Sequence, residues 1–459
     1  MITRAPCALA AVMAGVLAAL LLPGAPAGIG YVVVAAALAV TARFAVGPPQ
    51  RQRSALFGAL AVALALSAAL RDASWVVAGE LAATVVLGSI AMSVPRGWRA
   101  TGLAAIAAPR RSPAGALSML RAALDAAPHA SGTRALAVGR GLLLAGALLV
   151  VFGALFASGD RAFAQLAGDA LPGRLPLGDL PLRLLVFVLV IALAGGLVRA
   201  AGVVDAPARP ALLRIGPVEW RLTLVALNLL FAVFVAVQIA VLFGGDGYVR
   251  ETAGLTYAEY ARSGFAQLVI VALLTLAVVA ASLRWARADG HRAERLLRLL
   301  LVALCLLTIV VLASALHRLG LYERAFGFTR TRMAAHALLL FGGALLILVV
   351  AALAVGRRTW LPRATVALAA VAALAFWVSD PDRWIAAHNV ERYETTGRID
   401  VDYLGELSAD AVPELARLPA DLRDRALRAQ SLRLASTGDR FGGANRSRAR
   451  ARRVMAALP

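Results

Sequence analysis

The sequence contains no lysine and only two cysteines, and both shortages exclude classes of chemistry. All 47 basic residues are arginines. A nucleotide-binding P-loop, a kinase β3 lysine and a Schiff base to pyridoxal phosphate or retinal all require the lysine amino group. ATP-driven transport by this chain alone is therefore not expected. Cys7 and Cys305 both fall in hydrophobic stretches, so no disulfide framework and no zinc site is predicted.

Short catalytic motifs are also absent from the sequence. It contains no HExxH, no GxSxG, no histidine-kinase block and no helix-turn-helix pattern. No hydrophobic stretch combines several acidic residues, as many proton-driven transporters do. We therefore predict no cofactor and no bound metal. The sequence favours a protein that is not an enzyme, while leaving that question open.

Long hydrophobic runs are what the sequence has in place of motifs. Hydrophobic residues make up 61% of the 459 residues, and a membrane-crossing helix needs roughly 20 consecutive apolar residues. We predict an all-α, polytopic transmembrane bundle of eleven spans, with ten to twelve also compatible. The predicted spans are residues 8–22, 29–42, 55–70, 75–94, 135–158, 182–198, 222–243, 264–283, 299–316, 333–355 and 364–379.

The first hydrophobic stretch has an alternative interpretation. Residues 8–22 are short, Arg4 precedes them, and Ala25-Pro26-Ala27 follows. This arrangement also fits a signal peptide with an A-x-A cleavage site. A second hydrophobic stretch begins almost at once, which favours a span.

The distribution of arginine predicts the orientation of the chain. The formal net charge is +21, but the charges lie between hydrophobic stretches and therefore indicate no nucleic-acid partner. The N-terminus and the even-numbered connections hold far more Arg than acidic residues, whereas the other connections hold the two in similar numbers. Because cytoplasmic loops retain Arg, we predict a cytoplasmic N-terminus and an extracytoplasmic C-terminus. Abundant Ala, Val, Leu, Gly and Arg indicates a GC-rich bacterial genome and a bacterial cell membrane.

A change in composition near residue 135 is the clearest internal boundary. The four Ala-rich spans before it are joined by short turns, whereas the later connections are longer and polar. The amphipathic stretch 114–127 predicts an interfacial helix that contacts anionic lipid, or a solvated linker helix. The predicted regions are 1–94 (four spans), 95–134 (cytoplasmic loop), 135–379 (seven-span core), 380–436 (a small helical extracytoplasmic tail) and 437–459 (an Arg-rich disordered end).

Polar residues of chemical interest gather at one predicted face of the membrane. The spans that end near residues 158, 243, 316 and 379 all deliver carboxylates, guanidiniums, phenols or imidazoles to the outer side. These residues form our candidate outer face: Asp160, Arg161, Asp246, Tyr257, Glu259, His317, Arg318, Tyr322, Glu323, Arg330, Arg332, Asp380, Asp382, His388, Asn389 and Arg392.

Each group in this outer face has a functional and a structural interpretation. Arg318, Arg330 and Arg332 fit bidentate contacts to a phosphate or carboxylate, or cations that end helices and meet lipid phosphate. The pairs Asp380-x-Asp382 and Asp400-x-Asp402 fit a divalent ion or, more simply, turns and caps. His388 could serve as a general base. The predicted partners are the lipid bilayer and, at this face, an anionic lipid or phosphate-bearing ligand.

Three further polar residues lie inside predicted spans. Glu80 is the acidic residue of the fourth span, and intramembrane acids are functional candidates by default. Asn228 and Gln238 lie in the seventh span, where an amide more often bonds to a neighbouring helix than to a substrate.

Several stretches of the sequence resemble a bacterial family. They are TYAEYARSGFAQL (256–268), ALHRLGLYERAFGFTRTR (315–332), DPDRWIAAHNVER (380–392) and DVDYLGELSADAVPEL (400–415). This text is similar to multi-pass membrane proteins with the domain of unknown function 4173, and to its relative 4153. The resemblance spans roughly residues 135–420 and leaves out the first four spans. It implies a polytopic membrane protein but no activity.

Three functions remain open from the sequence. The leading hypothesis is a non-enzymatic sensor, scaffold or accessory factor whose outer polar face binds a partner. The second is a membrane enzyme for lipid-linked phosphate or sugar substrates, using the arginines with Asp382, Asp402 or His388. The third is a transporter with Glu80, Asn228 and Gln238 along its path.

Overall fold

The computed structural model describes residues 5–125, 180–202, 215–253, 265–438 and 440–458. This part of the chain is built from helices, joined by turns and one isolated bridge between Ile215 and Ala286. Eight of the described helices are long and apolar enough to cross a membrane, and two shorter apolar helices precede them. The predicted all-α transmembrane bundle is therefore confirmed, with a compatible number of spans. The predicted span 135–158 lies outside the described residues.

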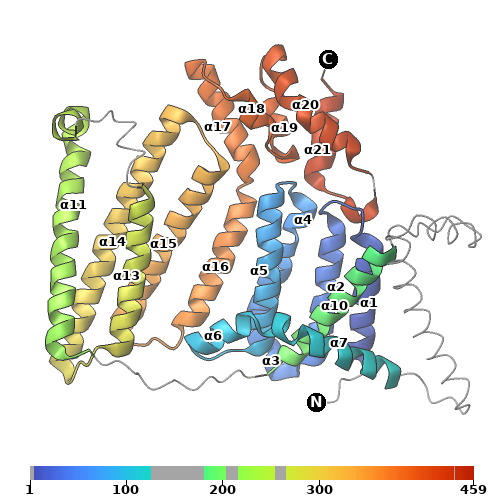
Figure 1. Ribbon diagram of the computed structural model, residues 1–459, viewed down its shortest axis with the longest axis horizontal. Helices are drawn as coiled ribbons and strands as arrows, with labels where there is room; N and C mark the ends of the chain where they lie inside the picture. The colour runs from blue at the N-terminus through green and yellow to red at the C-terminus, as the bar shows by residue number, and fades with distance from the viewer. Residues whose placement is uncertain (1–4, 126–179, 203–214, 254–264, 439, 459) are drawn as a thin grey trace, which may run out of the picture. The chain divides into compact units, whose positions relative to one another are not determined.

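The described helices fall into two compact units (Figure 1). Unit 1 comprises residues 1–205, 408–412 and 428–459, and unit 2 comprises residues 206–407 and 413–427. The predicted boundary near residue 135 falls outside the described residues.

Unit 1 contains the N-terminal helices. They are α1 (Ala5–Leu21), α2 (Ile29–Ala45), α3 (Pro48–Ala65), α4 (Ser67–Leu70), α5 (Ser74–Ser93), α6 (Trp98–Ala105), α7 (Ala107–Asp125) and α10 (Leu180–Ala200). Helix α1 packs against α2 and α10, and α3 packs against α5. Their buried residues are mostly small, including Ala8, Ala11, Ala194 and Ala200.

Helix α7, which contains most of the predicted amphipathic stretch, packs along α10. The two helices approach so closely at glycines that a Cβ on Gly115 would lie 2.4 Å from the backbone of Gly195 and Gly196. Arg111 adds a hydrogen bond of 2.7 Å from its Nη1 to the carbonyl oxygen of Arg199. Small residues permit such backbone contact between helices in a membrane.

Unit 2 contains the longest helices. They are α11 (Pro217–Ala253), α13 (Phe265–Trp285), α14 (His291–Phe326), α15 (Arg330–Val355), α16 (Leu361–Val378), α17 (Pro381–Thr396) and α18 (Val401–Gly405). Helix α14 contacts α11, α13 and α15, and α15 contacts α16. Glycines with positive φ end α14 and α15, at Gly327 and Gly356, because a C-terminal left-handed residue is easiest for glycine.

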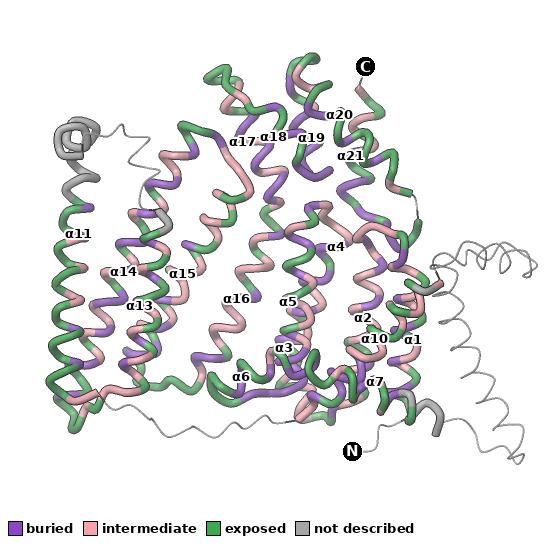
Figure 2. The backbone as a smooth tube through the Cα atoms, in the orientation of Figure 1, coloured by how far each residue is buried: buried purple, intermediate pink, exposed green. Residues whose placement is uncertain are grey.

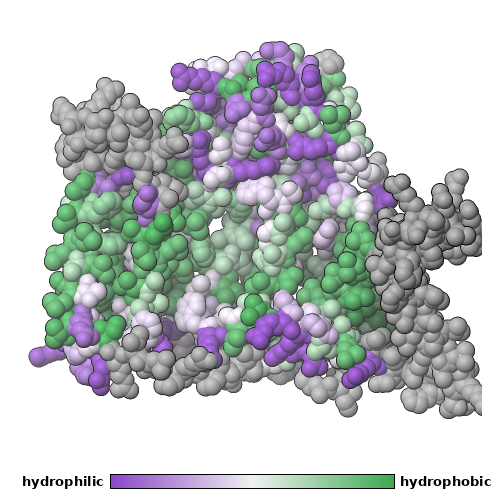
Figure 3. Space-filling view, in the orientation of Figure 1, coloured by the Kyte–Doolittle hydropathy of each residue, from purple (hydrophilic) through white to green (hydrophobic). Residues whose placement is uncertain are grey.

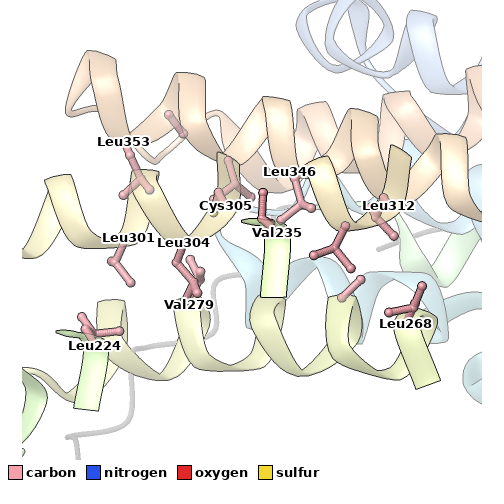
Figure 4. Packing of buried hydrophobic residues seen from close by; sticks show 14 of the residues in the cluster. Leu224, Val235, Leu268, Val279, Leu301, Leu304, Cys305, Leu312, Leu346 and Leu353 are labelled. Carbon is pink, nitrogen blue, oxygen red and sulfur yellow. The ribbon is translucent and has the colours of Figure 1, made fainter. Parts of the chain in front are cut away.

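The core of unit 2 is built from large aliphatic side chains. Leu301, Leu304 and Cys305 of α14 interdigitate with residues of α11, α13 and α15 (Figure 4). Buried positions recur along α14 and α15 between partly exposed ones (Figure 2). Helix α11 has only 11% of its most apolar stretch buried, and hydrophobic residues cover the middle of the surface that it shows in Figure 3. A helix that is apolar on its exposed side is suited to face lipid.

The C-terminal region continues with short helices: η2 (Ala409–Ala411), α19 (Val412–Leu415), α20 (Ala420–Ser436), η3 (Phe441–Gly443) and α21 (Arg446–Ala456). Disorder was the sequence-based expectation for residues 437–459, and the helices η3 and α21 contradict it within that range. The cause is tertiary. Asn445 caps α21 by accepting hydrogen bonds from the backbone N–H groups of Ser447 and Arg448, and Arg448 is buried against an aspartate, as described below.

Candidate functional site

The turn between α14 and α15, residues 327–329, is held by a side chain of α17. Asn389 accepts a hydrogen bond from the Phe328 N–H at 3.1 Å and donates one to the Phe328 carbonyl at 2.9 Å. Gly327 has a φ of +80°, and a Cβ there would lie 2.5 Å from the Asn389 Oδ1. Only glycine combines that backbone conformation with that close approach. Thr329 then caps α15.

Arg330, the first residue of α15, is joined to α17 by a bidentate ion pair. Its Nε lies 2.9 Å from Asp382 Oδ1 and its Nη2 lies 2.5 Å from Asp382 Oδ2. The Asp382 side chain is 0% exposed. The backbone N–H of Arg330 donates to the Tyr403 hydroxyl oxygen at 2.7 Å, and burial raises the pKa of Tyr403. Arg330 therefore fastens α15, α17 and α18 together.

Two more arginines cap the end of α14. Arg392 of α17 donates to the carbonyl oxygens of Ala325 at 2.8 Å and Arg324 at 3.3 Å. Arg332 donates to the carbonyl oxygen of Gly327, and its guanidinium carbon lies 4.2 Å from the centre of the Tyr322 ring. Guanidinium groups at a helix C-terminus satisfy terminal carbonyls and complement the helix dipole.

Aromatic rings cover this turn. Trp384 and His388 stack with their ring centres 3.8 Å apart, and Phe328 meets Trp384 edge-on at 4.8 Å. The His388 Nδ1 lies 2.9 Å from the Trp384 carbonyl oxygen, one helical turn away. His388 is thus engaged in packing and a local hydrogen bond rather than placed beside a carboxylate that would make it a base.

Two polar pairs link the helices of unit 2 near the same end. The His336 Nδ1 of α15 lies 3.3 Å from the Glu323 Oε1 of α14. Arg318 of α14 donates to the Gln238 Oε1 of α11 at 2.6 Å, and Ser314 donates to the same oxygen at 2.9 Å. Both pairs join neighbouring helices, which is the common use of polar side chains within membrane bundles.

The structure brings together eight of the predicted outer residues. Those at or beside the turn are Tyr322, Glu323, Arg330, Arg332, Asp382, His388, Asn389 and Arg392. His317 is exposed on α14, and Arg318 bonds to Gln238 instead. Asp380 precedes α17 with a φ of +54°. Asp246 lies in α11 where side chains are not described, and Asp160, Arg161, Tyr257 and Glu259 lie outside the described residues.

The two Asp-x-Asp stretches serve as caps and ion pairs. Asp382 pairs with Arg330, as described, and Asp400 caps α18 by accepting from the Tyr403 N–H at 3.1 Å. Asp402 is exposed and lies 3.3 Å from Arg425. In the part of the chain that the structure describes, no group of three or more His, Cys, Asp or Glu could hold a metal ion.

The predicted intramembrane polar residues lie in separate surroundings. The Asn228 Nδ2 donates to the carbonyl oxygens of Leu224 at 2.7 Å and Leu300 at 3.1 Å, so it ties α11 to α14. Glu80 of α5 is 4% exposed. Its Oε2 has no hydrogen-bond partner among the described residues.

A second buried polar cluster, in unit 1, was missed by the sequence analysis. The Asp410 Oδ2 accepts from the backbone N–H groups of Asp72 at 2.8 Å and Ala73 at 2.9 Å, and from the Ser408 hydroxyl. Its Oδ1 accepts from the Ser447 hydroxyl. The Asp72 Oδ1 in turn accepts a hydrogen bond of 2.5 Å from the Nη1 of Arg448. We name these residues, with Asn445, the C-terminal clasp.

The clasp joins α21 to the turn between α4 and α5. Asn445 donates to the carbonyl oxygens of Ala68 at 2.9 Å and Arg71 at 2.7 Å. Burial raises the pKa of Asp410 despite the hydrogen bonds that it accepts. A tight Arg71-Asp72 turn is a weak local signal for such a cluster, and nothing near it in the sequence indicates its partners.

The fold and both clusters define a polytopic α-helical integral membrane protein whose polar groups are concentrated at helix ends. The model of the family described as "Domain of unknown function (DUF4153)" matches residues 58–418. The chain therefore belongs to the DUF4153 family, the relative of the 4173 domain to which the sequence resemblance pointed first. The match begins inside α3, so the third and fourth predicted spans belong to the family region as well. No curated protein and no solved structure matches this chain.

Proposed function

We propose that this protein is a non-enzymatic scaffold in a bacterial cell membrane, and that α17 and α18 of unit 2 present its partner-binding face outside the cell. The proposal rests on one observation: the polar residues at the turn 327–329 form hydrogen bonds and an ion pair with one another's helices. Arg330, Asp382 and Asn389 are engaged with one another's helices. Their hydrogen-bonding groups are used to build a rigid cap.

The proposed orientation is supported by the arginines of unit 2. The connections at the ends of α13 and α15 that are opposite to the turn 327–329 hold Arg284, Arg287, Arg292, Arg357 and Arg358. Arginine in such short connections is retained in the cytoplasm. In this orientation, the exposed residues of α17 and α18 meet the outside. They include Glu391, Glu394 and Asp402, and acidic side chains of this kind suit a polar protein partner more than a lipid tail.

An enzyme would need some of the same residues to be available to a substrate. Asp382 is fully buried and already accepts two hydrogen bonds from Arg330. A phosphate at Arg330 would have to replace that carboxylate and break its buried ion pair, which costs several kcal/mol. The geometry therefore favours the scaffold over the enzyme.

The two functions are separated by a mutant cycle of Arg330→Ala, Asp382→Ala and the double variant. For the scaffold, each single variant lowers the amount of folded protein in the membrane, and the double variant is no worse than either because the pair acts as one unit. Arg425→Ala, which breaks the exposed pair with Asp402, is the control and leaves the amount unchanged. In the opposite outcome, both single variants keep the normal amount of protein in the membrane and lose the protein's function in the cell completely. That result would contradict the scaffold and favour the enzyme.

A reporter fused after Pro459 tests the orientation. Alkaline phosphatase, which is active only outside the cytoplasm, is expected to be active there, and a fluorescent protein that folds only in the cytoplasm is expected to be dark. The opposite pair of results would place α17 and α18 in the cytoplasm and refute the proposed face.

A transporter is the second candidate, and Glu80 is the observation that favours it. A buried carboxyl group without a hydrogen-bond partner for one oxygen is costly inside a membrane and often marks an ion path. Glu80→Gln is then expected to abolish proton-coupled flux in proteoliposomes while the unfolding midpoint stays near that of the wild type. Unchanged flux in the variant would remove this candidate.

A further inference from the structure

Unit 1 contains a crevice between four of its helices that the proposed function does not use. Its volume is about 640 Å³, and it is lined by residues of α2, α3, α5 and α10. A volume of this size lies within the range of ~300–1,000 Å³ that is usual for small-molecule sites. Its walls are almost entirely apolar, for example Leu38, Val62 and Leu197, and all of them belong to unit 1.

The crevice is long enough for an acyl chain. Its lining along α3 and the C-cap residue of that helix runs from Arg51 to Leu66, which is about 22 Å at about 1.5 Å per residue. One leaflet of a bilayer contributes about 15 Å, half of a hydrocarbon core of about 30 Å. A chain that starts at the Arg51 end can therefore lie in the crevice over its whole length.

Positive charge lies at one end of this apolar space. Arg43 and Arg51 line the crevice there, together with Ser54. The Nε of Arg51 donates to the carbonyl oxygens of Arg43 at 3.2 Å and Val46 at 2.9 Å. These two bonds fix the guanidinium in the first turns of α3, and a helix N-terminus itself favours an anion.

From this shape and charge we infer that the crevice binds one anionic phospholipid, with an acyl chain between α2, α3, α5 and α10 and the phosphate at Arg43 and Arg51. Guanidinium groups bind phosphate through paired, charge-assisted hydrogen bonds. The apolar walls exclude a free phosphate or a sugar from most of the volume, because neither could satisfy its polar groups there. The inference concerns unit 1 alone and does not depend on the proposed scaffold role of unit 2.

Two glycines provide a matched pair of variants for the apolar part of the site. Gly58 lines the crevice, and a Cβ built on it meets no atom within 4 Å. Gly58→Leu therefore places its side chain into the crevice without a clash at Cβ and with a better helix former than glycine. Gly79 of α5 is likewise open at its Cβ and does not line the crevice, so Gly79→Leu is the control.

Three arginines provide the matched variants for the charged end. The double variant Arg43→Gln and Arg51→Gln removes both positive charges from the lining. Arg53 lies two positions after Arg51, is exposed and does not line the crevice, so Arg53→Gln is the control. These changes at the mouth leave the apolar packing in place, which keeps this test independent of the glycine variants.

The test is native mass spectrometry of the full chain in detergent, titrated with dioleoyl phosphatidylglycerol or dioleoyl phosphatidylcholine. We expect one tightly bound phosphatidylglycerol and weaker binding of phosphatidylcholine. The double arginine variant should bind phosphatidylglycerol at least about tenfold more weakly, the loss expected from charged hydrogen bonds. Gly58→Leu should lose both lipids, and the controls Gly79→Leu and Arg53→Gln should bind as the wild type does.

Several results would overturn the inference. Equal binding of the two lipids would mean that the arginines select no phosphate charge, and retained binding by Gly58→Leu would place the lipid elsewhere. Equal losses in Gly58→Leu and Gly79→Leu would show a general effect on the bundle. A wild-type dimer that Gly58→Leu dissociates would make a second copy the occupant. An unfolding midpoint raised as much by inorganic phosphate as by phosphatidylglycerol would make the acyl chain irrelevant.

Discussion

The hydrophobic helices of unit 1 and unit 2 differ in the size of their buried side chains. Half of the buried residues in the described core clusters of unit 1 are alanines, such as Ala11, Ala108 and Ala194. About half of those in the core of unit 2 are leucines, such as Leu301 and Leu346. Where two helices fit closely, small residues let their backbones touch, as in α7 and α10. Where the helices do not fit closely, small residues leave space between them. The crevice in unit 1 illustrates that second outcome.

The polar residues of the two units are used alike, although their partners differ. In unit 2 an arginine beside a turn, Arg330 of α15, pairs with a buried aspartate of α17. In unit 1 the buried Asp410 binds the N-terminus of α5 and a serine of α21. Each cluster attaches a short C-terminal helix to the end of a hydrophobic bundle. The difference in core packing and the likeness of the caps lead to three predictions.

Removing a large side chain from the core of unit 2 should have the largest effect. Leu346 of α15 is 0% exposed, and Leu346→Ala would leave a cavity that the packed helices cannot close, costing about 2–5 kcal/mol of unfolding free energy. Leu340 lies on the same helix and is 61% exposed, so Leu340→Ala serves as the control with little effect. Unfolding in denaturant-containing mixed micelles measures both. Equal effects would mean that Leu346 is not tightly packed in the core of unit 2.

Substitution of Gly327 should destabilise the turn 327–329 through the contact with Asn389 as well as through backbone strain. Gly327→Ala places a methyl group against Asn389 at a positive φ. Gly290→Ala is the control, because Gly290 has a φ of +92° and a ψ of 156°, close to the +80° and 178° of Gly327, and no atom within 4 Å of its Cβ. An alanine held in this backbone region alone costs about 1–3 kcal/mol, and Gly327→Ala should cost more, with faster proteolysis of α17. If both variants lose the same stability, the asparagine contact is unimportant to the cap.

The two caps should respond to pH in opposite directions. Burial raises the pKa of Asp410 above its ordinary 3.8, so its contribution to folding is complete below that pH and is lost as pH rises through the raised value. Glu414 of α19 joins the cap of unit 2 by accepting a hydrogen bond of 2.9 Å from Arg383 of α17. Burial alone would raise the pKa of Glu414 as well, but hydrogen bonds from Arg383 and Arg417 outweigh burial and lower it below 4.5. Its contribution is present above 4.5 and is lost as pH falls through the lowered value.

Hydrogen–deuterium exchange over this acidic range, corrected for intrinsic rates, measures the two responses separately. Protection of α21 should decrease as pH rises through the Asp410 transition, and protection of α17 should decrease as pH falls through the Glu414 transition. Asp410→Asn and Glu414→Gln should each flatten only their own response. A change of the same sign in both helices would show that one global transition governs them.

The sequence predicted the helical spans well because their signal is local. Some twenty apolar residues without charge suffice to define a membrane helix, and α11, α13, α14 and α15 all lie where such runs occur. The candidate residues around Arg330 and Asp382 could be named from the sequence as well, because they stand at the ends of those runs. Their pairing could not be predicted, since a bidentate contact depends on the direction in which α17 leaves the membrane.

What the sequence determined by itself is the class of protein, a polytopic helical bundle with polar residues at the helix ends, because hydrophobicity and its periodicity act over short stretches. The tertiary structure decided which charged residues are buried and which partners they have. Asp72 and Arg448 are separated by 376 positions, and the Arg-rich segment that the sequence predicted to be disordered forms α21, with Arg448 against that carboxylate. A buried charge is stable only beside its partner, and only the folded chain brings the two together.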